Sequence, residues 1–175
     1  TLCALVFMQL FYTAPVYFKN NLLLDEDVIG VLLALNAFII AVIEMPIIRS
    51  LEDKWNPVSL ITLGCALFAF GYLFMAPWQM LISAIAYIVL ITFGEILSFP
   101  YANQLAMELS KKRRAEYLAY FSMSFSIAHI MAPSLGLGLA ERMGFSFLWL
   151  ISGILALIVC VLFFVSGSKL QARRK

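Results

Sequence analysis

Residues 145–167 read FSFLWLISGILALIVCVLFFVSG, and this uncharged stretch decides the fold class of the chain. A helix needs about 20 predominantly apolar residues to cross the hydrocarbon core of a bilayer. Lipid offers no hydrogen-bond partners, so a backbone that crosses it must pair within its own helix or in a closed barrel. We therefore predict a membrane-spanning helix at residues 145–167.

Five further stretches of the same kind precede this one. They lie at residues 2–18, 28–48, 58–76, 78–100 and 117–140, and charged or turn-forming residues separate them. A membrane β-barrel would show short strands of alternating hydrophobicity instead. We predict an all-α membrane protein with a single six-helix transmembrane domain over residues 1–175.

The composition supports a lipid environment. The chain is 63% hydrophobic and 13% charged, whereas soluble domains are about 45–50% apolar and about 25% charged. The net charge of +2 gives no indication of a nucleic-acid partner. Cys3, Cys65 and Cys160 lie in apolar runs without metal-site spacing. We interpret them as packing residues and expect no metal or other cofactor.

The basic residues predict the direction of the chain, because cytoplasmic loops of membrane proteins carry an excess of Lys and Arg. Ten basic residues fall on one side: Arg49, Lys54, Lys111, Lys112, Arg113, Arg114, Lys169, Arg173, Arg174 and Lys175. Only Lys19 and Arg142 fall on the other. We expect both ends of the segment to be cytoplasmic. Trp55, Trp78 and Trp149, near the span ends, fit anchoring at the membrane interface.

A weak internal repeat relates the two halves of the chain. Residues 27–30 (DVIG) and 116–119 (EYLA) open similar spans, and residues 53–56 (DKWN) and 141–144 (ERMG) close them. The match predicts two units of three helices each. Because an odd number of spans ends on the opposite side of the membrane, the second unit is inverted relative to the first. Inverted repeats are typical of secondary transporters. Chance similarity between apolar helices is the alternative.

Three ionisable side chains lie inside spans: Glu44, Glu95 and His129. Such residues are energetically unfavourable in lipid and are functional candidates. The spans at 58–76 and 145–167 carry none, so we expect those two to pack outside and the others to line a cavity.

Glu95 is the first candidate for proton coupling, because a carboxyl in a span can take up and release a proton. Tyr87 and Ser98 are predicted to share its stripe and to line the cavity. A salt-bridged or backbone-bonded structural carboxyl is the alternative.

His129 is the second candidate. Ser122, Ser126, His129 and Pro133 recur at i, i+4, i+7 and i+11 and therefore share one helix face. The face is either the wall of a polar cavity or a close helix seam. Histidine titrates near physiological pH and can relay a proton, but a hydrogen-bonded structural histidine is also consistent with the pattern.

Glu44 is the third candidate, and the favoured interpretation is a structural charge network with Arg49, five residues on. The remaining polar candidates could bond to a substrate or to a neighbouring helix. They are Gln9, Tyr12, Thr13, Asn36, Asn103 and Gln104.

The loop at residues 49–56, RSLEDKWN, resembles the G-x-L-A-D-R-x-G loop of the major facilitator superfamily. Leu51, Asp53 and Lys54 match that motif, and Asn56 replaces its last glycine. Asn tolerates the left-handed backbone conformation better than most residues, so this replacement is mild. The resemblance implies a cytoplasmic gate at these positions. Asp53 is expected to bond to its basic partners there, Arg113 or Arg114.

Residues 128–136, AHIMAPSLG, are similar to the antiporter signature G-x-x-x-G-P-x-x-G, with alanine for both glycines before the proline. Residues 14–18, 36–46 and 98–100 look like helices seven, eight and ten of a bacterial permease group. The chain also begins inside an apolar run without Met. The resemblance therefore implies the C-terminal half of a permease (helices 7–12), whose N-terminal six-helix half is missing.

The function that this resemblance implies is secondary active transport of a small molecule by alternating access in the bacterial inner membrane. Coupling to H⁺ or another ion, as antiporter or symporter, is expected. A six-helix channel or the membrane domain of a larger complex is the alternative. An intramembrane enzyme is disfavoured, because His129 is the only histidine and no Gly-x-Ser-x-Gly occurs.

The predicted direction can be tested with single cysteines at Asp25→Cys and Lys112→Cys. An impermeant thiol reagent added outside intact cells should label only the cysteine at position 25, because the basic loop is expected to be cytoplasmic. Equal labelling of both positions would contradict this topology.

Overall fold

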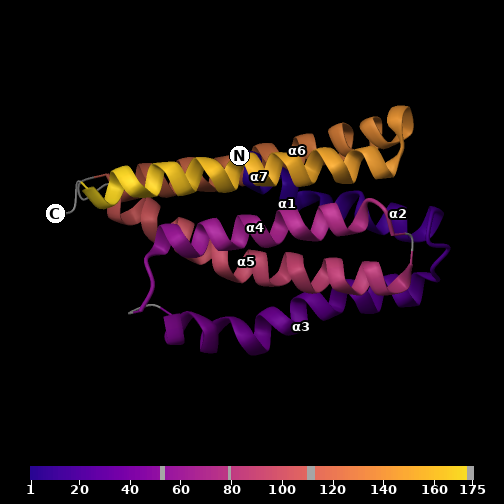
Figure 1. The fold of residues 1–175 in the computed structure, drawn as a ribbon, viewed down its shortest axis with the longest axis horizontal. Coiled ribbons are helices and arrows are strands. Elements are labelled where there is room, and N and C mark those ends of the chain that lie inside the picture. The colour runs from indigo at the N-terminus through magenta and orange to yellow at the C-terminus, as the bar shows by residue number, and fades with distance from the viewer. Residues whose placement is uncertain (52–53, 79, 110–112, 173–175) are drawn as a thin grey trace.

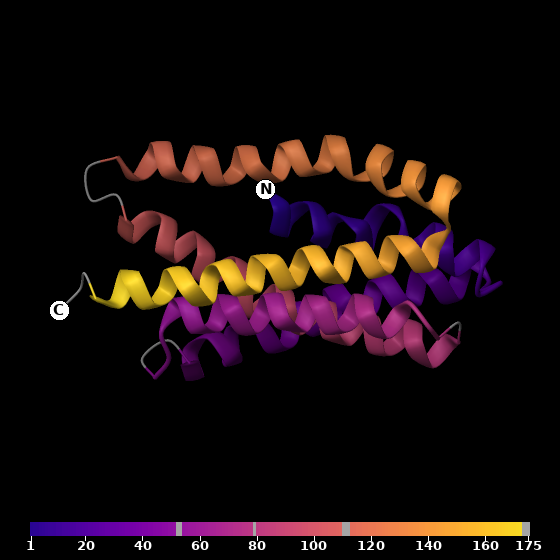
Figure 2. The ribbon, with the colours of Figure 1, turned by 45° about the horizontal axis from the view of Figure 1, so that its top comes forward.

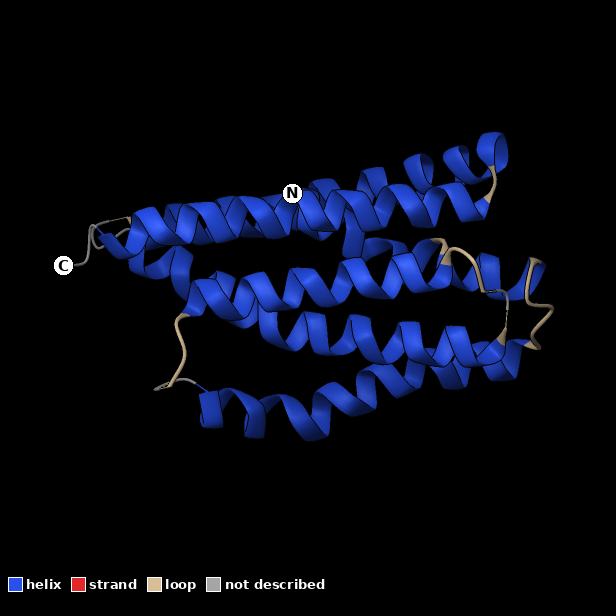
Figure 3. Cartoon of the chain, viewed as in Figure 1, coloured by secondary structure: helices blue, strands red, loops and turns tan. Residues whose placement is uncertain are grey.

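The computed structural model describes residues 1–51, 54–78, 80–109 and 113–172, and these residues form a bundle of helices without strands (Figures 1 and 3). The helices are α1 (Leu2–Tyr12), α2 (Ala14–Asn20), α3 (Glu26–Leu51), α4 (Pro57–Met75), α5 (Leu81–Leu109), α6 (Arg114–Met143) and α7 (Phe145–Ala172). Counting α1 and α2 as one span, six segments of the described chain are long and apolar enough to cross a membrane. The predicted all-α, six-helix fold class is confirmed.

The first span is interrupted at Thr13, between α1 and α2. The Thr13 hydroxyl donates to the carbonyl oxygen of Gln9 at 2.9 Å, a back-bond that bends helices. Pro15 follows at the start of α2 and lacks an N–H for the helix ladder. These two residues together account for the break.

Proline does not end the other spans. Pro46, Pro100 and Pro133 all lie inside helices. The predicted end at residue 100 therefore falls short, because α5 continues to Leu109. In membrane bundles neighbouring helices and local adjustments satisfy the backbone groups that a proline frees.

The helix pairing follows an inverted repeat (Figure 2). α4 packs against both α5 and α7, α1 packs against α6, and α3 packs against α5. The repeat exchanges α1 with α5, α3 with α6 and α4 with α7. Under this exchange the α1–α6 pair becomes the α5–α3 pair, and the α4–α7 pair is unchanged. These pairings are related as in transporters built from inverted repeats, whereas the close α4–α5 pairing has a much weaker counterpart in α1–α7.

The helix ends gather at two ends of the bundle. α3, α5 and α7 finish, and α4 and α6 begin, at the same end (Figure 1). Arg49 and Arg114 lie there, whereas Lys19 and Arg142 lie at the opposite end of their helices. The backbone thus places these basic residues at the ends that the span order predicts.

Asn56 starts α4 in a way that the sequence comparison did not predict. Its backbone is extended, with φ −71° and ψ 131°, and its side chain accepts from the Val58 N–H at 2.9 Å. Asn and a following proline are a favoured helix start. Asn56 therefore acts here as a helix N-cap and does not use its tolerance of the left-handed conformation.

An aromatic cluster fills the core where α2, α4, α5 and α7 meet. Trp149 is fully buried and packs against Tyr17 and Tyr72 with ring centroids 5.3 and 5.8 Å apart. The Tyr72 hydroxyl donates to the Val6 carbonyl oxygen at 2.5 Å. The predicted interfacial position of Trp149 is wrong, because its large ring is used to fill the core.

The two spans that were expected to pack outside, α4 and α7, differ in exposure. α7 exposes a broad apolar face that includes Ile154, Val161 and Phe164. α4 is covered on two sides and exposes a narrower stripe that includes Leu63 and Phe70. The expectation of an outer position therefore fits α7 better than α4. The reason is that α4 lies between α5 and α7 and packs against both.

The seam between α4 and α5 depends on the absence of a side chain at Gly64. A Cβ atom there would lie 2.6 Å from the Gly94 carbonyl oxygen and 2.9 Å from the Ser98 Cβ. Gly64→Ala should therefore destabilise the bundle by about 1–3 kcal/mol, seen as a lower melting temperature of the purified protein in detergent. Gly138→Ala is the matched control, since nothing lies within 4 Å of its added Cβ. Equal melting of the two variants would contradict the close seam.

Candidate functional site

A polar cavity of about 260 Å³ lies between α3, α5 and α6. Its lining is Ile40 and Glu44 from α3, Glu95, Ile96, Phe99, Pro100 and Asn103 from α5, and Phe121 from α6. Two of the three ionisable residues that the sequence singled out therefore face one cavity. These two carboxylates make it the candidate site.

Glu95 is positioned by a hydrogen-bond bridge from α3. The Asn36 amide nitrogen donates to the Thr92 hydroxyl at 3.0 Å and to the Glu95 carboxylate at 3.3 Å. Thr92 in turn donates to the Ile88 carbonyl oxygen at 2.6 Å. Asn36 is only 4% exposed, so the bridge joins α3 to α5 inside the bundle and orients the carboxylate.

Glu44 and Asn103 contribute oxygens without partners in the described part of the chain. Glu44 makes no ion pair there, so the network with Arg49 is wrong; Arg49 itself is exposed. The Asn103 Oδ1 atom is buried and has no hydrogen-bond partner among the described residues. The cavity therefore presents hydrogen-bond acceptors that these helices leave unsatisfied.

His129 lies apart from this cavity, on the exposed face of α6. Its Nδ1 is 3.0 Å from the Tyr12 hydroxyl, and the two rings are perpendicular with centroids 6.0 Å apart. If the hydroxyl donates to Nδ1, the remaining ring proton sits on Nε2. Ser122 and Ser126 are exposed on the same helix, as the predicted stripe requires.

Gln9 and Thr13 are placed in the seam between α1 and α6. Both are buried, and the Thr13 hydroxyl donates to the Gln9 Oε1 atom at 2.8 Å. Gln9 also donates to the Ala132 carbonyl oxygen at 3.4 Å, and Gly136 leaves room for both side chains. They satisfy each other and the backbone, and they do not line the polar cavity.

Tyr87 and Ser98 are separated from Glu95. Tyr87 is fully buried in the aromatic cluster and donates to the Tyr72 hydroxyl at 3.1 Å. Ser98 donates to the Gly94 carbonyl oxygen at 2.7 Å and faces a different cavity. The predicted shared stripe is therefore wrong.

The true stripe is visible in the sequence in retrospect. Thr92, Glu95, Phe99 and Asn103 recur at i, i+3, i+7 and i+11 along α5, and Asn36, Ile40 and Glu44 recur at i, i+4 and i+8 along α3. Both series follow one helix face. Sequence reasoning missed Thr92 as a member of the site.

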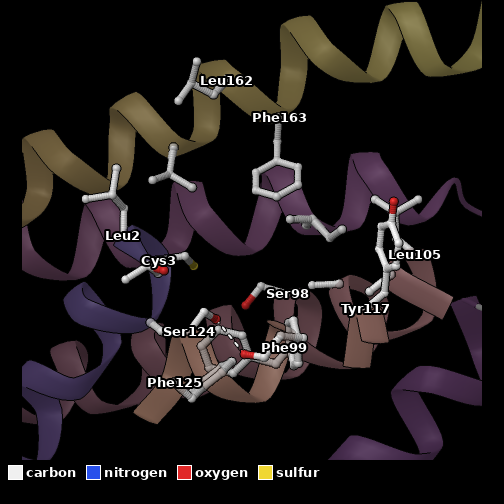
Figure 4. Close-up of a pocket in the computed structure, with 17 residues that line it drawn as sticks. Leu2, Cys3, Ser98, Phe99, Leu105, Tyr117, Ser124, Phe125, Leu162 and Phe163 are labelled. Carbon is white, nitrogen blue, oxygen red and sulfur yellow. Dashed lines mark hydrogen bonds between the residues drawn. The ribbon is translucent and has the colours of Figure 1, made fainter. Parts of the chain in front are cut away.

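A larger, apolar cavity of about 550 Å³ adjoins the polar one (Figure 4). Leu2, Phe125 and Phe163 contribute to its lining, which contains no Asp, Glu, Lys, Arg or His side chain. Phe99 and Phe121 line both cavities. We therefore place the ionic chemistry in the smaller cavity, although the larger one offers more space.

The residues of the gate motif are described in part. Leu51 packs against the apolar cluster around Tyr101, and Lys54 is exposed. Arg113 forms an exposed ion pair with Glu116 at 3.5 Å, and Arg114 is exposed at the start of α6. Asp53 lies outside the described residues, so its bond to Arg113 or Arg114 stays a prediction.

Membrane-length helices arranged as an inverted repeat, with carboxylates facing a cavity between the helices, define a multi-pass membrane protein of the transporter class. The family model of the Major Facilitator Superfamily matches residues 1–175, and the chain belongs to this family of membrane transporters. Comparisons with curated proteins and with solved structures find no match. The family resemblance drawn from the sequence is confirmed.

The bridge to Glu95 gives a test of the site's construction. Asn36→Ala leaves Thr92 and Glu95 without their donor in a buried setting, and losing such a partner costs about 1–3 kcal/mol. The melting temperature of the purified protein should fall by several degrees. Asn20→Ala, at an exposed position on α2, is the control and should melt like the parent. Equal effects would argue against the bridge.

Proposed function

We propose that residues 1–175 form one half of a secondary active transporter that moves a small molecule by alternating access. Family membership and the inverted repeat support this proposal. In transporters of this fold two six-helix halves rock about a site near the midplane between them. A channel would not need a site that changes its affinity between two states.

The exposed faces of α3 and α6 support a second half as the partner. Most of both helices is exposed in this chain, and their exposed positions include Ala34, Ala41, Ser122 and Ser126. Small residues let helix backbones approach closely in membranes. In this proposal the second half covers these faces. The membrane is a bacterial inner membrane, and both ends of the segment lie on its cytoplasmic side.

The proposal that transport is coupled to protons rests on Glu95. It lies within a span, faces a cavity, and accepts from the neutral amide of Asn36 at 3.3 Å. The proton affinity of a carboxyl differs between dry and hydrated surroundings. Alternating exposure of the cavity to water would therefore change how tightly Glu95 holds a proton. Such differential binding is what allows a ligand to drive a conformational equilibrium.

Glu44 shares the cavity with Glu95 and is the second carboxyl available to a proton. His129 is a further candidate, but it pairs with Tyr12 on the exposed face of α6 and does not line this cavity. In this proposal His129 contributes to the surface that meets the second half.

The test is Glu95→Gln in the complete gene product that contains residues 1–175. The substitution preserves shape but removes the titratable group. Gradient-driven accumulation in inverted or right-side-out vesicles should be lost by at least about tenfold, while downhill exchange continues. Glu141→Gln, at an exposed helix end, is the matched control and should accumulate normally. Normal uphill accumulation by Glu95→Gln would remove Glu95 from the coupling step.

A further inference from the structure

We propose that Asn36 is a positioning residue that links the packing of α3 on α5 to the charge of Glu95. While Glu95 is ionised, Asn36 holds α3 tightly against α5. When Glu95 takes up a proton, this attachment weakens and the last part of α3 separates from α5. The inference rests on the proposed coupling at Glu95 and adds the contact through which the proton acts on the helices.

The helix α3 has few buried anchors in this half. It packs chiefly against α5 and, less closely, against α2. Its buried residues are Ile29, Leu32 and Asn36, all in its first half, and no residue from 37 to 51 is buried. Toward that end α3 and α5 diverge (Figure 1). Asn36 is therefore the last buried anchor before a less covered segment of the helix.

The part of α3 beyond Asn36 is held by weaker contacts. Ile47 and Leu51 are half-buried against the apolar cluster around Tyr101. The Tyr101 hydroxyl donates to the Ile48 carbonyl oxygen at 3.4 Å, which is long for a bond between oxygen atoms. A change in the strength of the attachment at Asn36 therefore acts on a segment with few other restraints.

The hydrogen bonds of Asn36 fix which of its atoms faces Glu95. A side-chain amide has two N–H donors, and Asn36 directs one at the Thr92 hydroxyl, 3.0 Å away, and one at the Glu95 carboxylate, 3.3 Å away. The Thr92 hydroxyl donates its own proton to the Ile88 carbonyl oxygen, so toward Asn36 it can only accept. The network thus holds the amide nitrogen, and not its oxygen, toward Glu95.

Of the two bonds that Asn36 donates, only the one to Glu95 changes when a proton binds. A hydrogen bond to an ionised acceptor is roughly twice as strong as one between neutral groups. Asn36 is only 4% exposed, so water does not replace what the weaker bond loses. Neutralising Glu95 therefore weakens the attachment of α3, whereas the bond to Thr92 and the packing of Ile29 and Leu32 remain.

Glu44 is the other titratable group in the described lining of this cavity. It enters from α3, and the lining residues from α5 and α6 add no Asp, Glu, His, Lys or Arg besides Glu95. His129 pairs with Tyr12 and does not line the cavity. Glu44 is not part of the Asn36 bridge, so its titration leaves that bridge in place and makes it the matched control.

The position of α3 on α5 can be measured as a distance. We use the complete gene product with its native cysteines replaced by alanine and carry spin labels at Met45→Cys on α3 and Met107→Cys on α5, both exposed positions. A second pair, Leu63→Cys on α4 with Met107→Cys, is the control. Pulsed electron spin resonance gives the distance distribution of each pair at alkaline and at acidic pH. Acidification should increase the long-distance α3–α5 population several-fold and leave the α4–α5 pair unchanged.

Variants assign this change to the bridge. Asn36→Leu removes both donors, so the α3–α5 distribution should be the long one at both pH values. Glu95→Gln offers a neutral acceptor of the same shape and should also keep the long distribution at both. Glu44→Gln should respond to pH like the parent. If Asn36→Leu folds poorly, the comparison of Glu95→Gln with Glu44→Gln still decides.

Three results would overturn the inference. They are an α3–α5 distance in the parent that does not change with pH, a pH response that survives Asn36→Leu or Glu95→Gln, and an equal response of the α4–α5 pair. A merely structural Asn36 would lower the melting temperature on substitution but would leave the pH response of the distance in place.

The distance measurement needs neither substrate nor ion gradient, so its failure is distinct from failure of the coupling test. A distance that ignores pH, together with lost uphill accumulation in Glu95→Gln, would leave Glu95 in the coupling step and remove Asn36 as its link to α3. Normal uphill accumulation by Glu95→Gln would instead overturn both proposals, because the link needs Glu95 as the residue that takes up the proton.

Discussion

The rest of the structure depends on one constraint: inside a membrane, every polar group must find its partner within the protein. Thr13 bonds to Gln9, Tyr72 bonds to the Val6 carbonyl, and Asn36 bonds to Glu95. Each of these bonds lies in a helix or between two helices, so the polar side chains hold the bundle together. Among the described residues, the Oδ1 atom of Asn103 and the Nε1 atom of Trp149 depart from this rule, because both are buried without a hydrogen-bond partner.

The bundle divides into a packed core and a less covered part. The aromatic cluster around Trp149 joins α2, α4, α5 and α7 and fills the interior. α3 and α6 leave most of their length exposed, and both contribute to the polar cavity. A packed core resists deformation, so the helices around Trp149 form the rigid part of the bundle.

Charge sets the character of the cavity. Two carboxylates that line one cavity repel each other, and removing either from water is unfavourable. A positive charge in this cavity, such as the proton of the proposed coupling step, is therefore electrostatically favourable. The apolar space beyond Phe99 and Phe121 gains from a different property, burial of hydrocarbon. The two spaces meet at Phe99 and Phe121, where α5 packs against α6.

The sequence by itself determined the six helices, the helix ends that carry basic residues, the family, and the identity of Glu44, Glu95 and His129 as the ionisable residues in spans. These features follow from hydropathy and local spacing, which need no knowledge of neighbours. Only the tertiary structure decided that Glu44 and Glu95 share a cavity through the Asn36 bridge while His129 pairs with Tyr12. It also moved Tyr87 and Trp149 into the core. The reason is that hydropathy and spacing predict which residues share a helix face, but they do not encode which neighbouring helix packs against that face.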